Sequence, residues 1–134
     1  MSDSYTTTTK RLALRLKNKL EKVVARKALN IHRELVVQTP IDTGQAISNW
    51  TASLIVPSQA FVGPYAAGYK GSTWNQNTTA AISQGAVAFA GYHSGLKMYT
   101  SNNAPYIGML NRGWSKQAPS GYIMQAIVTG LKRP

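Results

Sequence analysis

The sequence lacks cysteine and has few acidic side chains. Its 134 residues include no cysteine, four acidic residues and two histidines. The absence of cysteine excludes thiol catalysis, disulfides and cysteine-ligated zinc or iron–sulfur sites. The carboxylates are Asp3, Glu21, Glu34 and Asp42. Four carboxylates are few from which to build a metal site or a pair of catalytic carboxylates. We therefore expect no cofactor and no enzymatic activity.

The two histidines do not make up for this shortage. His32 falls inside a predicted helix and is expected at its surface or at the edge of the core. A Ser–His–Asp triad would need His93, Asp42 and a serine, and the sequence has no nucleophile elbow to present that serine. Hydrolase chemistry is therefore disfavoured.

Long apolar runs are missing as well. No stretch approaches the roughly 20 residues needed to span a bilayer, and residues 1–10 are rich in Ser and Thr rather than in the apolar residues of a secretory signal. We therefore expect a soluble intracellular protein with no membrane association. The length suits one domain, so residues 1–134 are predicted to form a single domain in which residues 1–8 are flexible.

Positive charge is what the sequence has in excess. Fifteen Lys and Arg residues against four acids give a net charge of +11, which predicts attraction to polyanions or to acidic proteins. Nine of the fifteen lie within residues 1–34. In the same segment apolar residues recur every three or four positions, and this spacing predicts an amphipathic helix from about Thr9 to Val37, ended by Pro40. The residues predicted to face an anionic partner are Lys17, Lys19, Lys22 and Arg26.

The rest of the chain alternates turn-forming segments with short elements. Residues 39–44 form a turn cluster, and residues 50–56 alternate apolar and polar side chains as a half-buried strand does. The later expectations are a long loop or β-excursion over 57–76, a helix from 77 or 78 to about 92, a strand over 96–100, a turn at 101–103 and a short helix over 106–110. Residues 122–128 suit either a helix or a strand, with helix slightly favoured. The predicted class is α+β: a long N-terminal amphipathic helix and shorter helices packed on a small, mainly antiparallel sheet.

Three motifs in this order resemble a known family. They are Thr39-Pro40-Ile41-Asp42-Thr43-Gly44 followed by Asn49-Trp50, then Asn102-Asn103-Ala104-Pro105-Tyr106-Ile107, then Gly113-Trp114-Ser115-Lys116-Gln117-Ala118-Pro119-Ser120-Gly121. Together they resemble the neck or tail-completion (head–tail connector) proteins of tailed bacteriophages, over about residues 12 to 128. The chain departs from the family pattern at Gln45, where an arginine is usual, and at Asn111, where a glutamate is usual.

The resemblance implies a structural virion protein without enzymatic activity, found at the head–tail junction and in the host cytoplasm during assembly. It implies a homo-oligomeric ring, a hexamer or a dodecamer, that contacts head-closure or adaptor proteins and tail-terminator or tail-tube proteins. Genomic DNA would pass through the lumen without sequence-specific binding. The candidate interface residues are Asp42, Gly44, Trp50, Asn102, Asn103, Tyr106, Trp114, Lys116 and Gln117.

The basic helix also admits a second interpretation, a nucleic-acid-binding module. In a ring, however, many copies of a cationic helix facing the lumen would bind DNA strongly and with a steep salt dependence. Because the genome must slide through, we expect the cationic face to point toward acidic neighbouring proteins or solvent. The motifs do not distinguish a neck position from a tail-completion position.

Overall fold

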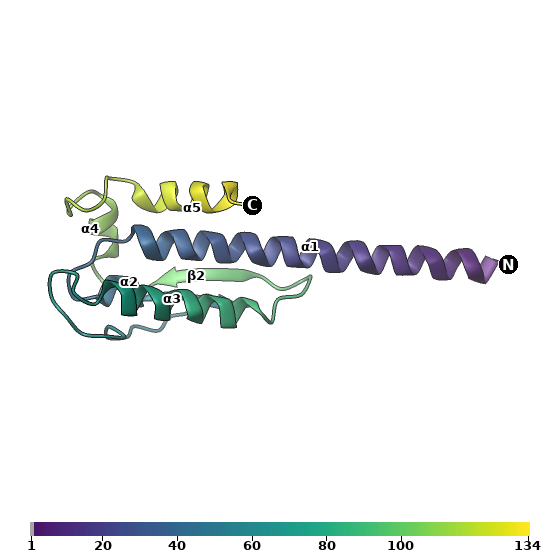
Figure 1. Ribbon diagram of the computed structural model, residues 1–134, viewed down its shortest axis with the longest axis horizontal. Helices are drawn as coiled ribbons and strands as arrows, with labels where there is room; N and C mark the ends of the chain where they lie inside the picture. The colour runs from purple at the N-terminus through teal and green to yellow at the C-terminus, as the bar shows by residue number, and fades with distance from the viewer. Residues whose placement is uncertain (1) are drawn as a thin grey trace.

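A long N-terminal helix dominates the computed structural model, which describes residues 2–134 (Figure 1). Helix α1 covers Ser2–Gln38. Its predicted end is confirmed, but its predicted start near Thr9 is wrong. Residues 6–9, all threonine, lie inside the helix instead of preceding it. Each threonine costs a helix only about 0.5 kcal/mol relative to Ala.

The remaining described elements are short. In chain order they are α2 (Gln45–Ser48), β1 (Trp50–Leu54), α3 (Trp74–Phe89), β2 (Met98–Asn102), α4 (Ile107–Asn111) and α5 (Tyr122–Lys132). Strands β1 and β2 pair antiparallel, with Trp50 opposite Asn102 and Leu54 opposite Met98. The predicted α+β class is therefore confirmed. Residues 122–132, which suited either a helix or a strand, form a helix.

Several predicted boundaries shift. Helix α3 begins at Trp74, earlier than expected, and ends at Phe89 rather than near residue 92. Strand β2 runs through Ser101 and Asn102, where a turn was expected. Between β1 and α3 the chain forms a loop without a strand, so the alternative of a β-excursion over 57–76 is wrong.

Buried amide side chains hold this loop in place. The Asn77 side chain is fully buried; its Oδ1 accepts hydrogen bonds from the Ser48 hydroxyl at 3.0 Å and from the Ala66 amide at 2.8 Å. The Asn49 side chain pairs with both the N–H and the C=O of Val62. The amides supply the backbone partners that a strand pairing would otherwise supply, which explains how a loop rich in Gly, Pro and Ser keeps one path.

Helix α1 runs between two layers. Figure 1 shows α5 along one side of α1, and α3 with the sheet along the other. The core between them contains the buried side chains of Leu35, Val36, Ile47, Trp50, Ala81 and Ala126. All of the α1 residues in this cluster come from the C-terminal third of the helix. The N-terminal part of α1 extends past both layers into solvent.

Candidate functional site

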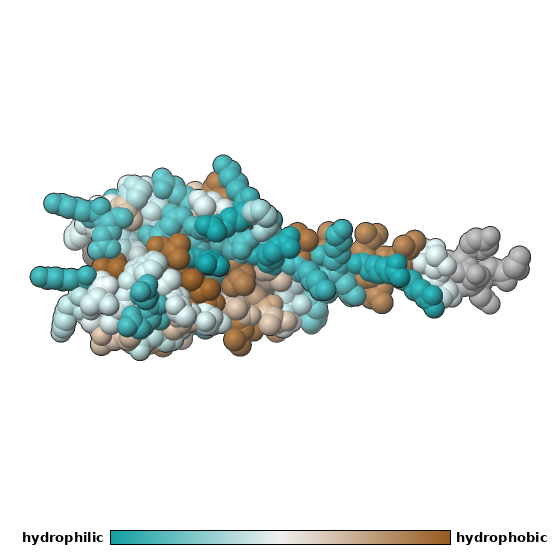
Figure 2. Space-filling model, in the orientation of Figure 1, coloured by the Kyte–Doolittle hydropathy of each residue, from teal (hydrophilic) through white to brown (hydrophobic). Residues whose placement is uncertain are grey.

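The part of α1 that leaves the body is the longest run of exposed residues in the part of the chain whose side chains the structure describes. Residues 6–20 are all exposed, and we call them the projecting segment. Three of its leucines, Leu12, Leu16 and Leu20, are spaced four apart and have exposed fractions of 53%, 62% and 62%. Residues four apart share one helix face, so they form a continuous leucine stripe. Figure 2 shows hydrophobic and hydrophilic side chains alternating along this segment.

A second stripe on α1 is cationic. At 100° per residue, six exposed basic residues fall on one side of the helix: Arg11, Arg15, Lys19, Lys22, Arg26 and Arg33. This cationic stripe begins on the projecting segment and continues along the body. It spans about 33 Å at 1.5 Å per residue, and it lies about a quarter turn from the leucine stripe.

The structure revises the predicted anionic-partner face. Lys19, Lys22 and Arg26 lie together on the cationic stripe as expected, but Lys17 is two residues from Lys19 and therefore points to the opposite side of the helix. Lys17 pairs instead with Glu21, at 4.0 Å. Three members of the stripe were missed, Arg11, Arg15 and Arg33. Arg15 lies four residues before Lys19 and Arg33 seven residues after Arg26, and these spacings were readable in the sequence.

Glu21 marks the point where α1 leaves the body. Its Oε1 accepts hydrogen bonds from the Ser94 amide at 2.9 Å and from the Ser94 hydroxyl at 2.8 Å. The Ser94 backbone N–H, followed by the Ser94 hydroxyl and the charge of Lys17, holds the pKa of Glu21 below its usual value. His93, beside Ser94, is exposed on the same turn. This contact links α1 to the connection between α3 and β2.

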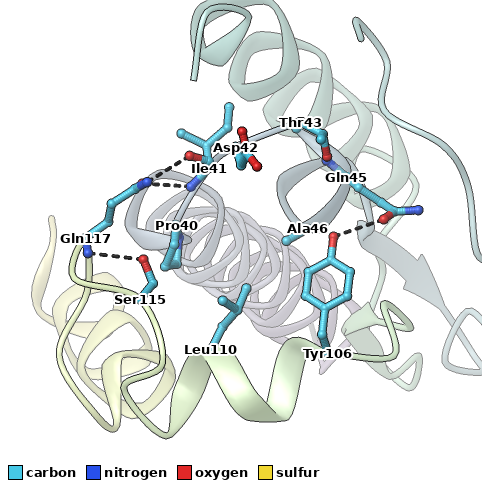
Figure 3. Close-up of a pocket in the computed structure, with 11 residues that line it drawn as sticks. Pro40, Ile41, Asp42, Thr43, Gln45, Ala46, Tyr106, Leu110, Ser115 and Gln117 are labelled. Atoms are coloured by element: carbon cyan, nitrogen blue, oxygen red, sulfur yellow. Dashed lines mark hydrogen bonds between the residues drawn. The ribbon is translucent and has the colours of Figure 1, made fainter. Parts of the chain in front are cut away.

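The turn cluster lies at the other end of the body and surrounds a pocket of about 350 Å³ (Figure 3). The side chains of Tyr106 and Gln117, both in its lining, hydrogen-bond to the residues of the turn cluster and its neighbour Gln45. The Tyr106 hydroxyl donates to Gln45 Oε1 at 3.1 Å, and burial raises the pKa of Tyr106. The Gln117 amide both accepts from the Ile41 N–H and donates to the Ile41 C=O, at 2.8 Å each. Tyr106 and Gln117, predicted as interface residues, therefore bind the turn cluster of their own chain.

Asp42 and Gly44, two further predicted interface residues, shape that turn. Asp42 Oδ1 accepts a hydrogen bond from the Lys70 N–H at 2.7 Å, and the Asp42 carbonyl accepts one from Gly71. Gly44 has φ +89°, and a Cβ there would lie 2.2 Å from Asn77 Nδ2. Both the positive φ and the close approach require glycine, so these two residues fix the turn rather than offer a contact.

The other predicted interface residues divide into buried and exposed groups. Trp50 is 5% exposed and donates from Nε1 to Thr39 Oγ1 at 2.7 Å, so it belongs to the core and not to an interface. Asn102 and Asn103 donate to backbone carbonyls, Asn102 to Ala46 and Asn103 to Ser58 and Ala60. Trp114 is 75% exposed and Lys116 is exposed as well. Asp42, Asn103 and Gln117 are also exposed, although each makes a hydrogen bond within its own chain.

His32 is a core residue, deeper than the surface or core-edge position expected. Its ring is fully buried. Nε2 donates to the Ala81 carbonyl at 2.8 Å, which leaves Nδ1 to accept from the Thr100 hydroxyl at 2.7 Å. Burial lowers the pKa of His32, with the Ala81 hydrogen bond acting in the opposite direction. The neutral ring links α1 to α3 and β2.

The described residues contain no group of three His, Asp or Glu side chains placed to hold a metal ion. His93 and Asp42, the two groups that a triad would need, lie at opposite ends of the body. His93 is beside the turn that contacts Glu21, and Asp42 follows the end of α1, about 25 Å further along at 1.5 Å per residue. Within residues 2–134 no helix is long and apolar enough to cross a membrane.

Comparisons with known proteins add no relative. No family model, no curated protein and no solved structure matches the chain.

Proposed function

We propose that this protein is a structural component of a tailed-bacteriophage virion, a neck or tail-completion protein that assembles into a ring at the head–tail junction. The observation that carries the proposal is the projecting segment. A helix of fifteen exposed residues with a leucine stripe leaves apolar surface uncovered, and contiguous exposed apolar surface of this kind is typical of protein–protein contacts. The resemblance of the turn motifs supports the phage assignment.

The proposal gives the chain no enzymatic role. The pocket at the turn cluster has one carboxylate, from Asp42, and one phenol, from Tyr106, among its lining residues. Both are engaged in hydrogen bonds that hold the turn. The hydroxyls of Thr43 and Ser115, which also line the pocket, each accept a hydrogen bond from a backbone N–H.

In this role the cationic stripe meets acidic neighbouring virion proteins rather than the genome. Its basic residues are exposed over about 33 Å, and such a surface repeated around a ring would bind passing DNA tightly if it faced the lumen. If the stripe lies on the outer side or at the end of the ring, it does not bind the DNA that passes through the lumen.

The proposal is tested by the mass of the purified protein. We expect a defined ring, of six or twelve copies, by native mass spectrometry, and a central channel by negative-stain electron microscopy. Binding of a head-closure or tail protein from the same phage would support the placement. A protein that stays monomeric at about 100 μM and binds no virion component contradicts the proposal.

A nucleic-acid-binding module is the second candidate, and the alignment of the cationic stripe on one face favours it. DNA binding at 0.15 M salt separates the two. A connector should bind duplex DNA weakly, with affinity lost as salt rises. A nucleic-acid module should keep micromolar or better affinity and lose at least tenfold in the K19Q/K22Q/R26Q variant. The K17Q variant is the matched control, because Lys17 lies off the stripe.

A further inference from the structure

The leucine stripe continues a surface that α5 covers further along α1. Helix α5 lies against α1 so that its C-terminal end reaches Lys27, whose Nζ donates to the carbonyls of Leu131 and Arg133. Ile31, which packs against the core cluster, lies on this side of α1, and at 100° per residue Leu12, Leu16 and Leu20 lie on the same side. The side of α1 that carries the leucine stripe is therefore covered by α5 in its C-terminal part, where Lys27 and Ile31 lie, and is bare in its N-terminal part.

A second bare apolar face lies on α5 itself. Tyr122, Ala126 and Gly130 turn inward and are buried. On the opposite side of the helix Met124, Val128 and Leu131 are 63%, 40% and 51% exposed. These three residues form the outer apolar face of α5.

The two bare faces are similar in length, and the α5 face carries little charge. Leu12 to Leu20 covers about 12 Å and Met124 to Leu131 about 10.5 Å, at 1.5 Å per residue. The segment 122–132 carries one charged side chain, Lys132, so the outer face of α5 offers little repulsion to a cationic helix. The cationic stripe is centred about a quarter turn away from the leucine stripe and borders such a contact.

From this match we propose that the leucine stripe of one copy packs on the outer apolar face of α5 of a second copy. The stripe and α5 are different surfaces, so the contact is heterologous and each copy keeps one free face of each kind. Heterologous contacts generate rings when the rotation closes. The inference rests on the proposed function in that the ring is the assembly it explains. The turn motifs were expected to supply the subunit interface. The proposal places that interface on helices α1 and α5 instead.

Cysteine cross-linking tests the contact directly, because the chain has no native cysteine. In the L16C/V128C variant the two thiols of one copy are separated by well over 15 Å along α1, beyond the 4.4–6.8 Å Cα separation of a disulfide. Mild oxidation should therefore give a ladder of covalent oligomers that dithiothreitol reverses. The matched control K22C/V128C puts the cysteine on the cationic stripe and should remain monomeric on a denaturing gel.

Mixing two defective variants tests the heterologous character. Both L12Q/L16Q/L20Q and M124Q/V128Q change exposed side chains, so each should fold, as circular dichroism would verify. Each alone should be monomeric, with self-association weakened at least a hundredfold. Mixed in equal amounts they should form a one-to-one heterodimer, since the first keeps the α5 face and the second keeps the leucine stripe.

The outcomes separate this inference from the proposed function. A ring that persists in L12Q/L16Q/L20Q, or two variants that fail to complement, overturns the contact and leaves the ring assignment standing. Cross-linked ladders without a closed ring or a virion partner support the contact and overturn the connector role. Monomers throughout, with no ladder, overturn both.

Discussion

The two ends of α1 have the same apolar spacing and opposite surroundings. At one end Leu35 is 2% exposed between α5, α3 and the sheet, and at the other Leu16 is 62% exposed with no cover from its own chain. Both lie on stripes with helical periodicity, and that periodicity does not distinguish them. A periodic apolar stripe thus predicts that a face is covered, but not whether the cover is the same chain or another.

Truncating a leucine at each end gives the largest expected contrast. We expect L35A to lower the free energy of unfolding by about 3 kcal/mol, because removing a buried leucine side chain leaves a cavity. L16A should change it by less than about 0.5 kcal/mol, as exposed positions do. Urea denaturation of dilute, monomeric protein measures both. Similar losses for the two variants would mean that the projecting segment is covered within its own chain.

A glycine on α5 tests how tightly the packed end is built. A Cβ on Gly130 would lie 2.5 Å from Ile31 Cα, in the α1 backbone, and a helix backbone cannot yield to it without shifting α5. We expect G130A to cost about 2 kcal/mol by overpacking. G108A on α4 is the control, because the nearest atom to a Cβ there is 3.9 Å away, and it should stay within about 0.5 kcal/mol of wild type. Thermal unfolding of the two variants measures both effects. An unchanged melting temperature for G130A would show that α5 does not depend on this close approach.

The fold was more predictable than the site. The elements and the α+β class followed from spacing, from Pro40 and from the turn residues, because these act locally. The exact start of α3 did not, since the helix was expected to begin at residue 77 or 78 and begins at Trp74. The side chain of Asn77 lies inside α3 and is buried, where it accepts hydrogen bonds from Ser48 and Ala66. These contacts depend on the path of the loop before α3, which local sequence patterns do not predict.

The candidate site shows the same limit in a different way. Charge counting found the basic helix, and a helical wheel would have separated Lys17 from Lys19 and added Arg15. The interface residues were chosen because amides and aromatics suit subunit contacts. Several of them, such as Gln117 and Asn102, bind backbone groups of their own chain, and sequence composition cannot tell an internal partner from an external one.

A pH titration should show the smallest effect, again at the packed end. The pKa of His32 is lower in the folded protein than its ordinary value of 6.5. Between those two values the unfolded chain binds more protons than the folded chain, so stability is fully present above about pH 6.5 and falls as the pH drops through this window. The free energy of unfolding, measured by urea denaturation from pH 7.5 to 5.5, should decline in wild type.

The H32Q variant provides the comparison for that titration. It lacks the titrating ring and should lose the slope between pH 6.5 and 5.5, even if it is less stable throughout. The lowered pKa of Glu21 acts below 4.5, outside this window. A slope that persists in H32Q would assign the pH dependence to a different group.

The hydrogen bonds from Lys27 to the end of α5 also affect how the chain folds. Lys27 and Leu131 are 104 positions apart, and Gly130 meets Ile31 across a similar separation. Contacts between such distant positions close late, and proteins that depend on them fold more slowly than bundles built from local contacts. During synthesis α1 therefore emerges with all of its leucines exposed, including those that are buried in the folded protein. Its C-terminal part is shielded from other nascent chains only after α5 has been synthesised and has packed on it.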